Sequence, residues 1–370
     1  MRVLVSPDSF GGTLTALESA LAIQTGWLQT SPDDEVVCLP ISDGGPGFID
    51  VVWQALGATR VPVVVQGPRG QDIPAEFALK GQHAWIESAQ ACGLHVLASD
   101  ERDPGVTTSF GLGQLIRVAT EMGATHITVG VGGTATNDGG AGMLAALGAT
   151  SSPDVLKSGG LALRDLEAIN LDNAHKLLQG VTLEIATDVD NPLLGGRGAT
   201  GTYAKQKGAD EDTVMRLEVA MRHFRDLCGK RHDGKDASLA LGAGSGGGIG
   251  FGLLLLGATR QSGISFVMDT VGFADHVNHS DLVITGEGCL DDQSLHGKVV
   301  IGVATQVASV GKPCIALAGE VRLGKRECAS AGIDAAYSLK ETVGQQRALG
   351  DAQQALTELA ARVARTWSRA

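Results

Sequence analysis

The sequence predicts an α/β fold with two domains, one of which is built on a parallel sheet. The 370 residues are enough for two domains. Short runs of β-branched residues alternate with stretches of helical periodicity, which is the pattern of parallel strands joined by helices. Glycine is abundant at 52 residues, and aromatic residues make up only 4% of the chain. This composition is common among α/β enzymes, which need many tight turns between strand and helix.

The N-terminal segment contains two strand–loop–helix units. We expect strands at residues 3–5 and 36–39 and helices at residues 16–28 and 48–56. Thr15 is the expected N-cap of the first helix, with Glu18 at the capping-box position. Consecutive units of this kind form a parallel sheet, and ligands bind beyond the carboxyl ends of its strands.

The pattern changes after residue 65 and returns to strand–helix units near residue 280. An antiparallel insert is predicted by short strands at residues 61–65, 76–79 and 84–87. Later strands are expected at residues 126–129, 183–187, 267–269, 282–285 and 314–317. Later helices are expected at residues 111–121, 141–147, 212–228, 299–310 and 351–367. We therefore predict a discontinuous domain of residues 1–65 and 280–370, interrupted by a second domain of residues 66–279.

The loop between the strand at 126–129 and the helix that starts at Ala141 is the first candidate site. It holds Gly132 and Gly133, followed by Asn137 and Asp138. Glycine allows the backbone to approach a ligand closely, and the N-terminus of the following helix favours anions. A carboxylate there can hold Mg²⁺ or a substrate hydroxyl. The loop therefore suits a phosphate, a cation and a hydroxyl together; the alternative is a tight turn with a polar cap.

Two aspartates follow the first two predicted strands directly. Asp8 and Asp43 would lie on neighbouring loops at the active-site edge of the sheet. Asp8 could orient a substrate hydroxyl or act as a base, and Asp43 could hold a metal. The alternative is helix N-capping, a role that aspartate fills well.

A second pair of carboxylates ends the strand at 183–187. Asp188 and Asp190 are followed by Asn191 and Pro192, so the segment is expected to turn and the two carboxylates could converge on Mg²⁺. Mg²⁺ in proteins is held by one or two carboxylates together with phosphate oxygens. The alternative is an Asx turn before the proline.

The chain contains further glycine-rich and basic segments. The richest glycine run, residues 242–250, contains Gly244, Ser245, Gly246 and Gly247. Its spacing formally matches a dinucleotide-binding fingerprint, but no good strand precedes it, which favours contact with phosphate or substrate. Two lysines, Lys207 and Lys298, are candidate phosphate contacts. For Lys207 a solvated loop is the alternative.

Charge and cysteine usage exclude several classes of function. The formal net charge of −12 argues against a nucleic-acid partner, which would need clustered Lys and Arg. Six scattered cysteines without a C-x-x-C pair indicate reduced thiols in the cytoplasm. The first apolar residues form a strand and not a signal peptide, and the longest apolar tract, residues 249–258, is too short to cross a bilayer.

Several motifs in one order resemble a known family. They are Ser-Pro-Asp-Ser-Phe at 6–10, Asp-Gly-Gly at 43–45, Thr107-Thr108, the glycine loop at 132–142, Asp-Val-Asp-Asn-Pro-Leu at 188–193, Gln-Lys-Gly-Ala at 206–209, the run at 242–250, Thr-Gly-Glu-Gly at 285–288, and Gln-Ser-Leu-His-Gly-Lys at 293–298. Together they cover nearly the whole chain. The sequence resembles the bacterial glycerate kinases of the glycerate 2-kinase type.

The resemblance implies ATP- and Mg²⁺-dependent phosphorylation of D-glycerate to 2-phosphoglycerate. It also implies a flavodoxin-like domain and a mixed α/β domain, with the site in the cleft. Catalytic roles are then expected for Asp8, Asp188, Asp190 and Lys298, with the metal on Asp188 and Asp190. Substrate contacts are expected from Ser9, Asp43, Thr107, Thr108, Asn137, Asp138 and Lys207. ATP contacts are expected from Gly132, Gly133, Gly244, Ser245, Gly246, Gly247 and Glu287.

Three positions depart from the family pattern. Gly11 and Cys289 stand where the family usually has Lys and Arg, and residues 46–48 replace Glu-Gly-Thr. Two cations are therefore missing near the expected site. The alternatives that this leaves open are a kinase for another small hydroxy acid and a non-catalytic metabolite-binding protein. A homodimer is also left open.

Overall fold

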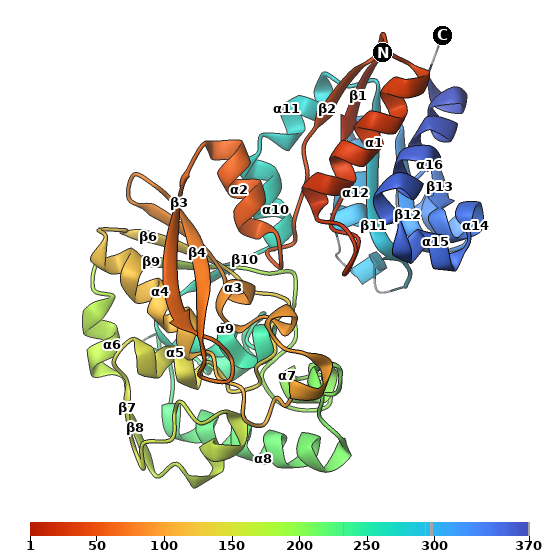
Figure 1. Cartoon of the computed structure of the whole chain (residues 1–370). Coiled ribbons are helices and arrows are strands. Elements are labelled where there is room, and N and C mark those ends of the chain that lie inside the picture. Colours follow the sequence, from red (N-terminus) through yellow and green to blue (C-terminus); the bar gives the residue numbers. More distant parts are fainter. Residues whose placement is uncertain (232, 293, 297–298, 369–370) are drawn as a thin grey trace. The chain divides into compact units, whose positions relative to one another are not determined.

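The computed structural model describes residues 1–231, 233–292, 294–296 and 299–368. The chain forms two compact units (Figure 1). The terminal unit consists of residues 1–43 and the chain from residue 264 onward, and the inserted unit consists of residues 44–263. The sequence pattern placed these two boundaries later, at 65/66 and 279/280, because the helix at 48–56 continues the strand–helix alternation without a break.

The terminal unit is built on a five-stranded sheet in which every pairing is parallel. Its strands are β1 (Arg2–Val5), β2 (Glu35–Cys38), β11 (Leu282–Leu290), β12 (Cys314–Val321) and β13 (Ala335–Ser338), in the spatial order β13-β12-β11-β1-β2. Numbered within the unit, this is the order of the flavodoxin-like fold. The predicted parallel-sheet domain is confirmed. The interior strand β1, which lies between β11 and β2, is fully buried at Val3, Leu4 and Val5, as expected for a strand covered on both faces.

Helices accompany this sheet in the terminal unit. They are α1 (Ala16–Thr30), α10 (Gly263–Thr270), α11 (Phe273–Asn278), α12 (Val299–Ser309), α13 (Lys325–Ser330), α14 (Leu339–Val343), α15 (Gln345–Gly350) and α16 (Ala352–Trp367). The predicted capping box begins α1, because Glu18 N donates to Thr15 Oγ1 at 3.1 Å and Thr15 N donates to Glu18 Oε2 at 2.8 Å. Helix α1 packs closely on α16, where a Cβ at Gly26 would lie 2.0 Å from Thr357 O. Glycine is therefore required at this crossing.

The inserted unit contains a six-stranded mixed sheet. Its strands are β3 (Thr59–Gln66), β4 (Asp72–Lys80), β5 (His83–Glu87), β6 (His126–Gly130), β9 (Thr182–Ala186) and β10 (Thr259–Gln261), in the order β10-β9-β6-β5-β4-β3. Strands β3, β4 and β5 are antiparallel, as the sequence predicted, and the other pairings are parallel. A separate hairpin pairs β7 (Thr150–Ser152) with β8 (Ala168–Asn170). The predicted mixed α/β fold of this unit is confirmed.

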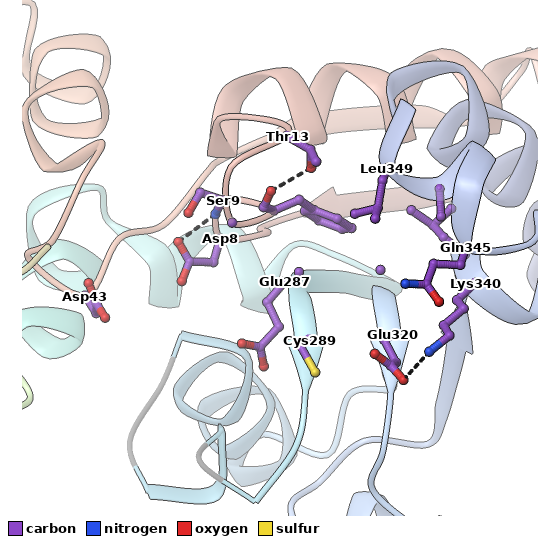
Figure 2. Close-up of a pocket in the computed structure, with 16 residues that line it drawn as sticks. Asp8, Ser9, Thr13, Asp43, Glu287, Cys289, Glu320, Lys340, Gln345 and Leu349 are labelled. Carbon is purple, nitrogen blue, oxygen red and sulfur yellow. Dashed lines mark hydrogen bonds and ion pairs between the residues drawn. The ribbon is translucent and has the colours of Figure 1, made fainter. Parts of the chain in front are cut away.

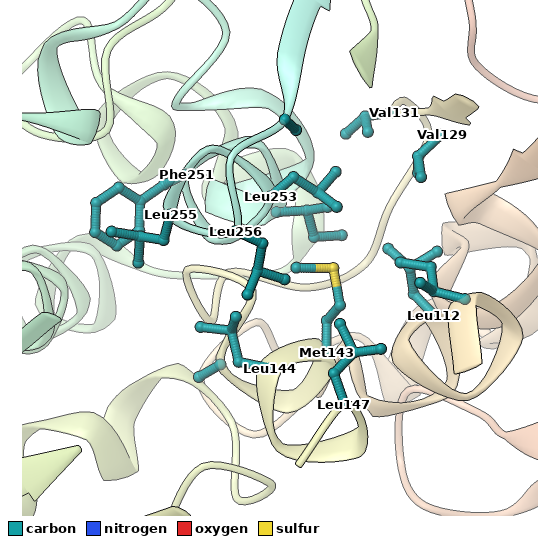
Figure 3. Packing of buried hydrophobic residues seen from close by; sticks show 14 of the residues in the cluster. Leu112, Val129, Val131, Met143, Leu144, Leu147, Phe251, Leu253, Leu255 and Leu256 are labelled. Carbon is teal, nitrogen blue, oxygen red and sulfur yellow. The ribbon is translucent and has the colours of Figure 1, made fainter. Parts of the chain in front are cut away.

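The core of the inserted unit lies between the sheet and its helices (Figure 3). The helices are α2 (Phe48–Leu56), α3 (Ser88–Cys92), α4 (Phe110–Glu121), α5 (Ala141–Ala146), α6 (Asp172–Leu177), α7 (Ala199–Tyr203), α8 (Glu211–Cys228) and α9 (Ser245–Leu255). Leu112, Val129, Met143 and Leu253 bring α4, β6, α5 and α9 into one buried cluster. These four elements carry the loops of the candidate site.

One predicted strand is wrong. Residues 267–269 belong to helix α10 (Gly263–Thr270). The buried residues Ile264, Val267, Met268 and Val271 recur at the helical spacing i, i+3, i+4 and i+7, so their side chains share one face. An apolar run of three residues is too short to distinguish the period of a helix from that of a strand. Within the described residues, no helix combines the length and apolarity needed to cross a membrane.

Candidate active site

The terminal unit has a pocket at the carboxyl edge of its sheet (Figure 2). Its volume is about 460 Å³. The loop after β1 contributes Asp8 to Gly11, β11 contributes Glu287 to Cys289, and β12 contributes Glu320. Strands β1 and β11 are the neighbours at which the strand order reverses, and in flavodoxin-like sheets ligands bind at that switch point. The topology thus places this pocket where the fold normally holds a ligand.

Three predicted site residues give one side of this pocket a negative character. Asp8 accepts a hydrogen bond from Ser9 N at 2.6 Å, and its own amide is fixed by Gly286 O at 2.8 Å. Burial raises the pKa of Asp8 well above its ordinary value, and the charges of Asp43 and Glu287 raise it further. Carboxylates in this arrangement attract cations and hydroxyl donors. Asp8 is also suited to accept a proton, because its pKa lies closer to neutrality than that of an exposed aspartate.

The other side of the pocket combines an ion pair with apolar groups. Lys340 Nζ donates to Glu320 Oε1 at 2.8 Å, and Arg322 donates to Glu320 Oε2 at 3.0 Å. These hydrogen bonds lower the pKa of Glu320. The helices α14 and α15 add Leu339, Gln345, Ala348 and Leu349. Lys340 is therefore engaged by a carboxylate and does not provide an open anion site.

In the inserted unit, Asp138 organises the glycine loop from within. It is completely buried, and its two oxygens accept bonds from Ser109 N and Oγ at 2.8 Å each, Gly140 N at 3.0 Å and Gly142 N at 3.2 Å. Burial raises the pKa of Asp138, while these hydrogen bonds act in the opposite direction. The carboxylate thus joins the start of α4 to the start of α5. Thr108 N is held in turn by Pro68 O at 2.9 Å.

The residues around Asp138 support the same loop. Lys207 is 3% exposed, and its Nζ donates to Thr136 O at 2.6 Å. Burial lowers the pKa of Lys207 to about 8. Thr107 Oγ1 donates to Ala135 O at 2.9 Å, and Asn137 Nδ2 donates to Thr200 Oγ1 at 3.0 Å. Among the described residues, the buried Asn137 Oδ1 has no hydrogen-bond partner, so it can accept one from a ligand.

The two glycine motifs, which are far apart in the sequence, lie against each other. Gly246, Gly247 and Gly248 all have positive φ at the start of α9. A Cβ at Gly247 would lie 1.9 Å from Thr136 O, and Gly139 N donates to Gly247 O at 3.0 Å. At the start of the first glycine motif, a Cβ at Gly132 would lie 2.7 Å from the Cα of Gly45. Glycine is therefore needed here so that backbone can pack on backbone.

Asp188 and Asp190 follow β9 and engage partners that follow or lie on β10. Asp188 Oδ1 accepts from Ser262 Oγ at 2.6 Å, and Asp190 pairs with Arg260 at 2.6 Å. Carboxylate oxygens are the ligands that Mg²⁺ prefers, and one or two suffice when phosphate is present. The donor type therefore fits Mg²⁺, although Asp190 would have to exchange Arg260 for the metal. No cluster of three or more metal-ligating side chains occurs among the described residues.

The sequence analysis did not single out Glu87, and one residue that it did predict, Lys298, cannot be placed. Glu87 ends β5, is 2% exposed, and accepts from Gly47 N at 3.0 Å and Ile49 N at 3.3 Å at the start of α2. Burial raises the pKa of Glu87 to about 8. A carboxylate at a strand end was the available signal, as it was for Asp8. Lys298 lies outside the described residues.

Comparisons with known proteins agree over nearly the full chain. The glycerate kinase family matches residues 3–368. The glycerate kinase of Haemophilus influenzae is 40% identical and aligns with 99% of this chain and 98% of its own length. The glycerate 2-kinase of Escherichia coli is 39% identical over 93% and 92% of the two chains. A crystal structure of a candidate glycerate kinase 2 from Salmonella typhimurium LT2 superposes with a TM-score of 0.79 at 37% identity, covering 99% of this chain and 98% of that one.

Proposed function

The chain belongs to the glycerate kinase family, and on that basis we propose that it transfers a phosphoryl group from ATP to the 2-hydroxyl of D-glycerate, forming 2-phosphoglycerate. The family match over residues 3–368 is the observation that carries the proposal. It includes every described segment in which candidate residues were found. Phosphoryl transfer depends on positioning and charge neutralisation more than on covalent chemistry, and both units offer groups for these tasks.

In the terminal unit, we assign Asp8 to the acceptor hydroxyl. Its carboxylate lines the pocket, and its raised pKa suits a group that takes up a proton as the hydroxyl attacks. Ser9 and Asp43 line the same pocket and would orient the substrate. The Ser9 amide already fixes one oxygen of Asp8, which restricts how that carboxylate can turn.

In the inserted unit, we assign the glycine loops to the phosphates of ATP. Gly132, Gly133 and residues 244–247 would contact the phosphates through their backbone, and the close packing of the two motifs on neighbouring backbone would hold that backbone in place. Thr107, Asp138 and Lys207 would act through the loop whose backbone they hold. Mg²⁺, which Asp188 and Asp190 would hold, neutralises phosphate charge when bound. Lys298 remains a predicted phosphate contact.

A second candidate is a kinase for another small hydroxy acid. It is favoured by the lining of the terminal-unit pocket, where Gly11 and Cys289 both contribute and Lys340 is paired with Glu320. A substrate carboxylate would find little positive charge among these described residues.

The cysteine usage, with all six thiols free, supports a location in the cytoplasm. A homodimer is a further proposal that sedimentation would test.

The test is ADP release from Mg²⁺-ATP with and without D-glycerate, with the product identified by phosphorus NMR. We expect glycerate-dependent ADP and a 2-phosphate signal. A 3-phosphate signal would correct the position of transfer. A folded protein that turns over a different hydroxy acid, but not glycerate, would replace the first candidate with the second. No turnover with any hydroxy acid would contradict both.

A further inference from the structure

The pocket of the terminal unit has two chemically different halves. Figure 2 shows Asp8, Asp43 and Glu287 on one side, Gln345, Lys340 and Leu349 on the other, and Cys289 between them. The first side is acidic. The second side, which we call the α15 side, is formed by Phe10, Glu320, Leu339, Lys340, Gln345, Ala348 and Leu349. A small hydroxy acid needs only one of these environments, so the second half is available to another ligand.

The α15 side offers apolar surface to a ligand. Phe10 and Leu339 are buried at 2% and 1% exposure and belong to the core of the unit. Leu349, in contrast, is 63% exposed although it lines the same pocket. A buried apolar floor with a large exposed apolar side chain at its margin suits a flat, weakly polar ring. Glycerate, with two hydroxyls and a carboxylate on three carbons, has no such surface.

The polar groups on the same side suit a nucleoside. The Gln345 amide offers both a donor and an acceptor, which a purine edge can use. The Glu320 carboxylate can accept hydrogen bonds from sugar hydroxyls, and Lys340 and Arg322 keep it ionised. The volume of about 460 Å³ lies within the range of roughly 300–1,000 Å³ typical of small-molecule and cofactor pockets. The pocket is larger than a three-carbon acid requires.

We propose that the α15 side of this pocket binds the purine nucleoside of the phosphate donor, with the base between the apolar residues and the sugar near Glu320. The inference rests on the proposed function, because it takes the donor to be ATP. The acidic half would repel a bare triphosphate, but the donor enters as its magnesium complex, whose charge offsets that repulsion. Glycerate alone gains nothing from the α15 side.

A measurement without turnover tests this directly. Cys289 lines the pocket and is partly exposed, so its alkylation by iodoacetamide reports occupancy. In the full-length protein, adenosine and ATP should each slow alkylation of Cys289 several-fold, as read by mass spectrometry of the Cys289 peptide. Cys38, which is also partly exposed but does not line the pocket, is the internal control and should react at an unchanged rate. D-glycerate alone should slow the alkylation of Cys289 less than adenosine does.

A pair of matched variants tests the apolar contact. Leu349→Ala removes an exposed leucine from the pocket, and Leu21→Ala removes a 44% exposed leucine from α1 of the same unit. Leu349→Ala should raise KM for ATP by about tenfold and weaken protection by adenosine, with KM for D-glycerate within about twofold. Leu21→Ala should change neither constant.

The outcomes separate this inference from the proposed function. Glycerate turnover with no adenosine protection of Cys289 and an unchanged KM for ATP in Leu349→Ala would overturn the nucleoside assignment and leave the function standing. Adenosine protection without glycerate turnover would support the assignment and overturn the function. Protection of Cys289 by D-glycerate, but not by adenosine, would show that the acceptor and not the nucleoside binds beside Cys289, and would overturn the assignment.

Discussion

The terminal unit presents its charged groups to a cavity, whereas the inserted unit uses buried charged groups to hold its own backbone. Asp8 lines an open pocket with a pKa raised by burial and by neighbouring carboxylates. Asp138 and Lys207 in the inserted unit are fully or almost fully buried and bind loop atoms. The difference shows that two aspartates in loops after parallel strands can have different roles: Asp8 faces a pocket, and Asp138 binds the backbone of its own loop. On the proposed function, the terminal unit would supply the proton acceptor, and the loops held by Asp138 and Lys207 would supply a rigid backbone surface.

The sharpest way to break this comparison is Asp8→Asn. If Asp8 handles the acceptor proton, kcat should fall by about 10³-fold, because general-base contributions commonly reach 10²–10⁴-fold. Thermal stability should hold or rise, since the change removes a carboxylate that lies beside Asp43 and Glu287. Steady-state ADP release and a melting curve measure the two quantities. The exposed Asp33→Asn in the same unit is the control, and a fully active Asp8→Asn enzyme would remove Asp8 from the mechanism.

The next test addresses the rigid backbone of the inserted unit. Gly247→Ala should lower the free energy of unfolding by about 3 kcal/mol or more, because the new Cβ would lie 1.9 Å from Thr136 O at a φ of +70°. Gly257→Ala is a matched control with a φ of +89° and nothing within 4 Å. Gly257→Ala should therefore lower the free energy of unfolding only by the backbone strain of an alanine at positive φ, about 1 kcal/mol. Urea unfolding measures both, and equal losses would show that the two glycine motifs do not pack as described.

The smallest expected effect concerns pH and Glu87. Its pKa is about 8 in the folded protein against an ordinary 4.5, so the folded state binds the proton more tightly. Its stabilising contribution is therefore complete below about pH 4.5 and is lost as the pH rises through 8. Relative to Glu87→Gln, the wild-type protein should lose about 2 kcal/mol of unfolding free energy between pH 6 and 8. Parallel pH profiles of the two proteins would contradict this.

Much of the fold could be predicted, because its elements carry strong local signals. Val3, Leu4 and Val5 form an apolar run of strand length, and Thr15 with Glu18 marks a helix start. The helix at residues 267–269 was missed because the apolar run is short and both periods fit it. The compact units divide at 43/44, whereas the sequence pattern predicts a boundary at 65/66, because nothing in the local pattern separates α2 from the strand–helix units before it.

The site could be predicted only as candidate residues. Strand ends drew attention to Asp8 and Asp188, but the hydrogen bonds and ion pairs of such carboxylates are decided by partners from distant segments. Asp190 pairs with Arg260 from β10, a contact that no local spacing encodes. The burial of Lys207 is likewise set by tertiary packing, since its neighbour Lys205 is exposed and pairs with Glu211. Reactivity depends on this packing and therefore cannot be deduced from residue type.

The discontinuity of the terminal unit also fixes an order of events during synthesis. Strands β1 and β2 leave the ribosome first, but β1 pairs with β11 on its other side, and α1 packs on α16 at the end of the chain. The inserted unit is complete in sequence before β11 is translated. The nascent chain therefore contains the whole sequence of the inserted unit while the edge of β1 still lacks its neighbour. Ribosome pausing within residues 264–280 would prolong this exposed state, in which strand edges invite aggregation.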